Sequence, residues 1–153
     1  MSPRITDALL AYAHFISIFA TFGMLCAELV LCRGPLVAAQ VRRLARIDIA
    51  YFACAMAVLA TGLLRLFFGA KGSGFYLHNP VFHAKLGLFL LVGLISIPPT
   101  LRFIAWRKRM KGNEQATVTA AEARGAARLV HLELALLAAI PLLAALMARG
   151  VGQ

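Results

Sequence analysis

The sequence predicts an all-α integral membrane protein whose helices form a four-helix bundle. Apolar residues make up 61% of the 153 residues, charged residues only 14%, and the mean hydropathy is +0.82. A soluble domain carries roughly 25% charged residues. The apolar residues also gather in four continuous runs, each long enough for the about 20 residues that a helix needs to cross a bilayer.

The four runs place the predicted spans at about 8–32, 48–69, 82–104 and 129–149. We expect helices, because the strands of a membrane barrel alternate in polarity and are about half as long. Asn79-Pro80 is a typical start signal for the third helix. The chain is therefore predicted to form a single membrane domain, residues 1–153, in contact with the lipid bilayer.

The basic residues predict how the bundle is oriented. The formal net charge is +10, and the basic residues lie between the apolar runs. We therefore attribute the charge to membrane topology, and we do not expect nucleic acid as a partner. Eleven of the sixteen fall on one predicted side: Arg33, Arg42, Arg43, Arg46, Arg102, Arg107, Lys108, Arg109, Lys111, Arg124 and Arg128. The positive-inside rule places that side in the cytoplasm. The prediction is a multi-pass protein of the bacterial inner membrane with both termini periplasmic.

Polar residues recur at helical spacing along the first span. They are His14, Ser17, Thr21 and Glu28, separated by three, four and seven residues. At about 100° per residue they share one stripe of the helix. Lipid cannot satisfy polar groups, so the stripe is expected to face the other helices.

The ionisable residues of the spans sort into two predicted layers. The outer layer holds His14, Arg65, His78, His83 and Lys85. The inner layer holds Glu28, Asp48, His131 and Glu133, close in sequence to Arg46 and Arg128. We interpret the inner layer as ion pairs that hold helix ends together. Asp48 and Glu133 lie near predicted helix starts, where the helix dipole also favours negative charge.

The outer layer combines histidines with cations and contains no acidic residue of the spans. Such a cationic pocket suits an anionic group: haem propionates, a lipid phosphate or a quinone headgroup. Imidazole is a common haem ligand, and four-helix bundles place cofactors between facing helices. His14 and His83 are thus candidate ligands of a haem iron, and Arg65, Lys71 and Lys85 are candidates for binding the propionates.

A structural reading of the same residues stays open. A histidine in a membrane helix can simply hydrogen-bond to a neighbouring helix. Arg65 and Lys85 can extend their charged ends to the membrane surface. His78 precedes Asn-Pro and is expected in a loop.

Several motifs resemble those of a known family. They are Gly62-Leu63-Leu64-Arg65, Lys71-Gly72, Asn79-Pro80 with Phe82 and Lys85, Ser96 with Pro99-Thr100, and the terminal Met147-Ala148-Arg149-Gly150. With His14 and Glu28, they are similar to a bacterial family of small four-helix inner-membrane proteins that carries a domain of unknown function. That family is distantly similar to CopD-type copper-resistance proteins and HemJ-type protoporphyrinogen oxidases. The HemJ-type resemblance implies a b-type haem, His14 as its ligand and a quinone as electron acceptor.

Two functions follow as hypotheses. The first is a haem b-binding redox or electron-transfer protein with a quinone or respiratory partner. The alternative is a non-redox membrane protein: a metal-handling or transport protein, or an accessory subunit of a membrane complex. Whether the chain is an enzyme and whether it forms a homo-oligomer are left open by the sequence.

Overall fold

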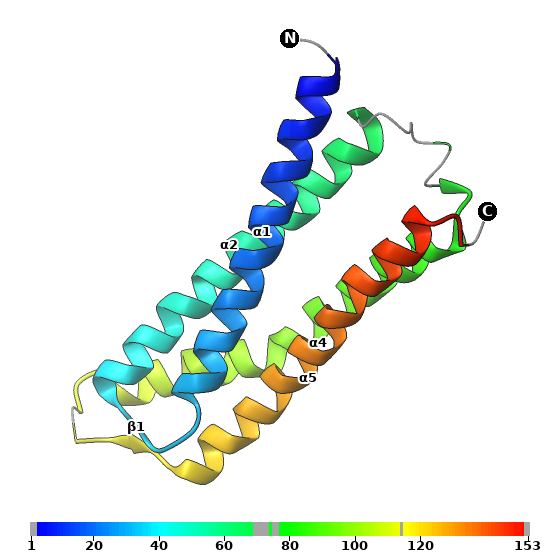
Figure 1. The fold of residues 1–153 in the computed structure, drawn as a ribbon. Helices are drawn as coiled ribbons and strands as arrows, with labels where there is room; N and C mark the ends of the chain where they lie inside the picture. The colour runs from blue at the N-terminus through cyan, green and yellow to red at the C-terminus, as the bar shows by residue number, and fades with distance from the viewer. Residues whose placement is uncertain (1–2, 69–73, 75–76, 114, 152–153) are drawn as a thin grey trace.

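Four long helices form the computed structural model of this chain (Figure 1), which describes residues 3–68, 74, 77–113 and 115–151. Their bounds are α1 Pro3–Leu31, α2 Ala38–Phe68, α4 Pro80–Met110 and α5 Ala120–Ala148. Each of the four is long and apolar enough to cross a membrane. The predicted all-α architecture with four spanning helices is confirmed.

The helices are longer than the predicted spans. Helices of 29 and 31 residues extend about 45 Å, whereas the hydrocarbon core of a bilayer is about 30 Å thick. The extra turns lie mainly in polar sequence that hydropathy alone assigns to linkers. Thr119 begins α5 with a capping box, in which its side chain accepts from the Glu122 amide and the Glu122 carboxylate accepts from the Thr119 amide. This motif extends the last helix about nine residues before the apolar run.

Asn79 begins α4 as the sequence predicts. Its side-chain oxygen accepts a hydrogen bond from the Val81 amide at 2.8 Å, and Pro80 takes the first helical position. The Asn79 amide also donates to the Val151 carbonyl at 3.3 Å, which ties the start of α4 to the end of the chain. Asn79 is almost completely buried, so both hydrogen bonds are shielded from competing groups.

A short two-stranded ribbon joins the two helical hairpins. β1, Leu36–Val37, pairs antiparallel with β2, Thr117–Val118, with Leu36 opposite Val118. The α1–α2 and α4–α5 connections therefore lie at the same end of the bundle, as predicted, and the termini lie at the other end (Figure 1). Which of these ends is cytoplasmic stays a prediction.

The hydrophobic core is concentrated near this ribbon. α1 packs mainly on α2 and α4 mainly on α5, and the two pairs come together at the ribbon end and diverge toward the termini (Figure 1). Fully buried core residues from all of these elements include Leu25, Leu44, Phe103, Val118 and Val130. The large apolar side chains that remain exposed are spread over all four helices, as a lipid-facing surface requires.

Candidate functional site

His14 of α1 contacts α2 through a specific hydrogen bond. Its Nδ1 lies 2.9 Å from the Thr61 hydroxyl oxygen. The Thr61 hydroxyl in turn donates to the Ala57 carbonyl at 2.6 Å, with the Val58 carbonyl at 3.2 Å as a second acceptor. A hydroxyl has one hydrogen, so a Thr61 that donates to its own helix can only accept from His14. This arrangement favours a proton on Nδ1 and leaves Nε2 with a free lone pair.

Gly62 provides the space for the His14 ring. A Cβ atom at this position would lie 3.3 Å from His14 Cε1, closer than ordinary van der Waals contact. The ring therefore packs directly against the backbone of α2. Thr61 and Gly62 together fix the position of His14 between the first two helices.

Two cations lie near this histidine. His14, Arg65 of α2 and Lys85 of α4 interact electrostatically with one another. The Arg65 guanidinium lies over the Phe15 ring, with Cζ 5.8 Å from the ring centroid. Its Nε is buried and has no hydrogen-bond partner among the described residues. The structure thus brings together three of the sequence-predicted residues, from three helices, at the end where the helix pairs diverge.

The other predicted residues of the outer layer have different surroundings. His83 is exposed, and its Nδ1 lies 3.1 Å from the Asn79 carbonyl, one turn earlier in the chain. His78 is exposed just before α4 and lies 2.9 Å from the Gly74 carbonyl. Lys71 lies outside the described residues. No contact between His83 and His14 is seen in the described part of the chain, and the role of His83 as a second ligand stays a prediction.

The polar stripe of α1 faces the interior, as predicted. Thr21 and Glu28 are 2% exposed, and His14 and Ser17 are half-buried. The Ser17 and Thr21 hydroxyls donate to carbonyls of their own helix at 2.8 Å. Glu28 differs from these hydroxyls, because its Oε1 is buried and has no hydrogen-bond partner among the described residues.

Glu28 belongs to a cluster of three buried carboxyl groups. Asp48 of α2 is 8% exposed and Glu133 of α5 is 1% exposed, and the three groups interact electrostatically with one another. Within the described residues, neither oxygen of Glu133 has a geometrically formed hydrogen bond, although the Tyr51 hydroxyl lies nearby. Carboxyl groups from three helices therefore lie within electrostatic range of one another in the half of the bundle nearer the ribbon.

The predicted ion pairs of this inner layer are not formed by the described residues. Arg46, Arg128 and His131 are exposed. Side chains two residues apart on an α-helix, such as Arg46 and Asp48, point in directions about 200° apart. Side chains five residues apart, such as Arg128 and Glu133, point about 140° apart. Arg46 thus points away from Asp48, and Arg128 away from Glu133. Proximity in sequence placed these groups at one depth but not on one face, so the interpretation as ion pairs was wrong.

A salt bridge lies at the ribbon end of the bundle. The Arg109 guanidinium donates to the Glu122 carboxylate at 2.8 Å and also to the Thr117 carbonyl at 3.1 Å. It joins the end of α4 to β2 and to the start of α5. Because these contacts connect the two helices of the α4–α5 hairpin, the salt bridge helps to close the hairpin.

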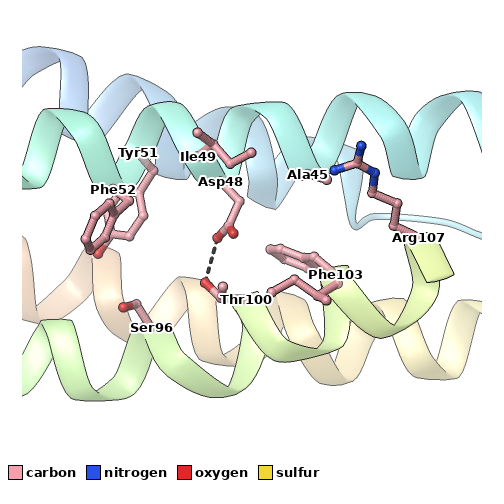
Figure 2. Close-up of a pocket in the computed structure, with 10 residues that line it drawn as sticks. Ala45, Asp48, Ile49, Tyr51, Phe52, Ser96, Thr100, Phe103 and Arg107 are labelled. Atoms are coloured by element: carbon pink, nitrogen blue, oxygen red, sulfur yellow. Dashed lines mark hydrogen bonds between the residues drawn. The ribbon is translucent and has the colours of Figure 1, made fainter.

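A cavity of about 400 Å³ lies between α2 and α4 beside the carboxyl cluster (Figure 2). The Thr100 hydroxyl donates to Asp48 Oδ1 across the cavity at 2.7 Å. Aromatic side chains flank this pair, with Tyr51 and Phe52 on one side and Phe103 on the other (Figure 2). Among the residues that the structure describes, no three His, Cys, Asp or Glu side chains are grouped to hold a metal ion.

These features define a polytopic membrane protein with two polar centres, one cationic near the termini and one acidic near the ribbon. The chain belongs to the family described as predicted membrane protein (DUF2214), whose model matches residues 6–152. Comparison with curated proteins and with solved structures gives no match. The sequence motifs predicted a family of membrane proteins that carries a domain of unknown function, and this membership is confirmed.

Sequence reasoning missed four contributors to these centres. Thr61 lies four residues before Arg65, which places it on the same face of α2, and this spacing was the available signal. Gly62 was noted only as part of a motif. Tyr51 and Thr100 carry no sequence signal for their contacts, because their neighbours come from other helices.

Proposed function

We propose that this protein is a haem b-binding redox protein of the bacterial inner membrane, in which His14 would bind the haem iron. The observation that supports the proposal best is the His14–Thr61 hydrogen bond. Histidines that bind metals commonly donate their second ring N–H to a fixed acceptor, which sets the tautomer and orients the ring. In this chain the Thr61 hydroxyl is that acceptor, and Nε2 is left for iron.

The surrounding charges also fit the carboxylate groups of haem. Arg65 and Lys85 are held near His14 and repel one another, and the described part of the chain provides no acceptor for the buried Arg65 Nε. An anion between them would satisfy the donor and offset the repulsion. Lys71 remains a proposed contributor from outside the described residues, as does His83 as a second ligand. When bound, haem b would supply one-electron transfer, with a quinone or a respiratory partner as the proposed acceptor.

The residues of the chain would each have a defined task in this site. His14 would bind the iron, and Thr61 and Gly62 would hold its ring in position. Arg65 and Lys85 would bind the propionates and so fix the orientation of the cofactor.

The test is a visible absorption spectrum of protein expressed with ample haem. We expect a Soret band that is lost in His14→Ala and weakened in Thr61→Val and Arg65→Gln. His131→Ala is the matched control, because His131 is exposed near the ribbon and lies outside the cluster. A colourless wild-type protein, or a Soret band unchanged in His14→Ala, would contradict the proposal.

A specific observation favours the alternative of a non-redox transport protein. Charged groups buried in membrane proteins often mark ion pathways, and Glu28, Asp48 and Glu133 are buried together without a basic partner among the described residues. Such a cluster would exchange protons. Proteoliposomes loaded with a pH-sensitive dye test this: proton flux that is lost in Glu133→Gln would favour transport, and no flux above protein-free vesicles would reject it.

A further inference from the structure

The cavity between α2 and α4 has the chemistry of a cation-binding site. Its walls are mainly apolar and aromatic, and Asp48 is the acidic side chain that lines it. Asp48 is 8% exposed, and its Oδ1 accepts a hydrogen bond from the Thr100 hydroxyl. A pocket with mainly apolar walls and a few polar or charged groups is typical of small-molecule sites.

The charges around the cavity favour a positive ligand. Glu28 and Glu133 lie behind Asp48, close enough to interact with it electrostatically. Neither has a basic hydrogen-bond or ion-pair partner among the described residues. Buried carboxyl groups that interact with one another do not all carry a charge at once. A cation beside Asp48, the acidic group that lines the cavity, would interact favourably with its ionised form.

The aromatic side chains favour an organic cation over a hydrated metal ion. Tyr51, Phe52 and Phe103 surround the Asp48–Thr100 pair (Figure 2). Aromatic faces attract cations that have lost their water, and quaternary ammonium groups are bound in this way. A hydrated metal ion would lose its water against these walls without gaining enough oxygen ligands.

Access to the cavity suits an apolar molecule. The lining residues Ile49, Phe52 and Ile104 are largely exposed on the outer faces of α2 and α4. A ligand could therefore enter sideways from the lipid. Arg107 lines the opposite end, beyond Phe103 from Asp48 (Figure 2), where its exposed side chain does not cover the carboxylate.

From these observations we propose that the cavity binds a small lipophilic organic cation, with its charged group at Asp48 and its apolar body against Phe52 and Phe103. Asp48 lies 13 residues from Thr61 on the same helix, about 20 Å along the axis. Binding here therefore does not depend on whether haem is bound at His14.

The test compares two probes of nearly the same shape: benzyltrimethylammonium and its uncharged isostere neopentylbenzene. Binding to the detergent-purified protein is measured by equilibrium dialysis against protein-free micelles, which corrects for partition into detergent. We expect the cation to bind about tenfold or more tightly than the isostere, because only the cation interacts with Asp48 and the aromatic faces.

Variants then locate the bound cation. Asp48→Asn should abolish the preference for the cation, Asp48→Glu should retain part of it, and Phe52→Leu should weaken binding several-fold. Glu122→Gln, an acidic residue outside the cavity, is the matched control and should bind like wild type.

Two results would overturn the proposal. Equal binding of the two probes by the wild-type protein, or no binding of either, would show that the cavity does not select positive charge, and this comparison needs no variant. Unchanged preference in a folded Asp48→Asn variant, judged by its size-exclusion profile, would show that the cation binds elsewhere. A Soret band in the same preparation reports separately on the haem proposal.

Discussion

Replacing Glu133 with methionine should stabilise the protein, although most substitutions of buried residues destabilise. Glu133 is 1% exposed, neither of its oxygens has a geometrically formed hydrogen bond within the described residues, and its electrostatic neighbours include Asp48 and Glu28. The nearby Tyr51 hydroxyl is a neutral group and offsets only part of the cost of burying the carboxyl group. Methionine has a similar length and no polar group, so it fills the same space.

The size of the effect follows from replacements of buried ionic groups by apolar side chains of similar volume, which are neutral to stabilising by about 1–4 kcal/mol. A gain of about 1–3 kcal/mol would raise the apparent unfolding temperature by about 3–10 °C in a chain of this length. Glu133→Gln should gain less, because its amide would also lack partners and an unsatisfied buried amide costs about 1–3 kcal/mol.

The assay is thermal unfolding in detergent, followed by the fraction that remains monodisperse in size-exclusion chromatography. Glu122→Gln is the control on the same helix and should destabilise, since it loses a salt bridge and part of a capping box. A clear loss of stability in Glu133→Met would refute the reasoning and indicate that Glu133 has a stabilising partner.

Three further predictions concern single positions. Gly62→Val should destabilise by about 1–3 kcal/mol in thermal unfolding, because the valine side chain would collide with the His14 ring. Gly87→Val is the control, because a Cβ atom added at Gly87 would have no described neighbouring atom within 4 Å and should not overpack. Equal losses of stability in the two variants would count against the close contact at Gly62. Burial raises the pKa of the Cys32 thiol to about 12. A variant with Cys32 as its single cysteine should therefore resist labelling by maleimide at neutral pH and react faster as the pH rises. Rapid labelling at neutral pH would show that Cys32 is not buried. Asn79→Ala should cost about 1–2 kcal/mol in the same unfolding assay through loss of the α4 cap, and an unchanged stability would show that the cap is dispensable.

Much of the fold follows from local sequence. Four apolar runs predict four spanning helices, because lipid leaves the backbone almost no alternative. The Asn79-Pro80 start signal and the inward-facing stripe with Thr21 and Glu28 are local patterns, and both are seen in the structure. The shared end of the two linkers follows from the number of spans.

The helix ends were less predictable. Hydropathy marks where a helix enters lipid, but helices continue beyond the membrane wherever a polar sequence can still form hydrogen-bonded turns. The capping box of Thr119 and Glu122 shows where α5 starts, well before its apolar run. Such caps are short polar motifs and are invisible to an average of hydropathy.

The candidate sites depended still more on packing between helices. The sequence by itself determined a membrane bundle of four helices and the depth of His14, Arg65 and Lys85, since span length and residue number fix position along each helix. Only the tertiary structure decided that these three share one cluster and that Thr61 orients His14. It also decided that Glu28, Asp48 and Glu133 lie near one another, with no basic partner in the described part of the chain. Depth is a property of one helix, whereas these contacts depend on the rotation of each helix about its axis, which the neighbouring helices set.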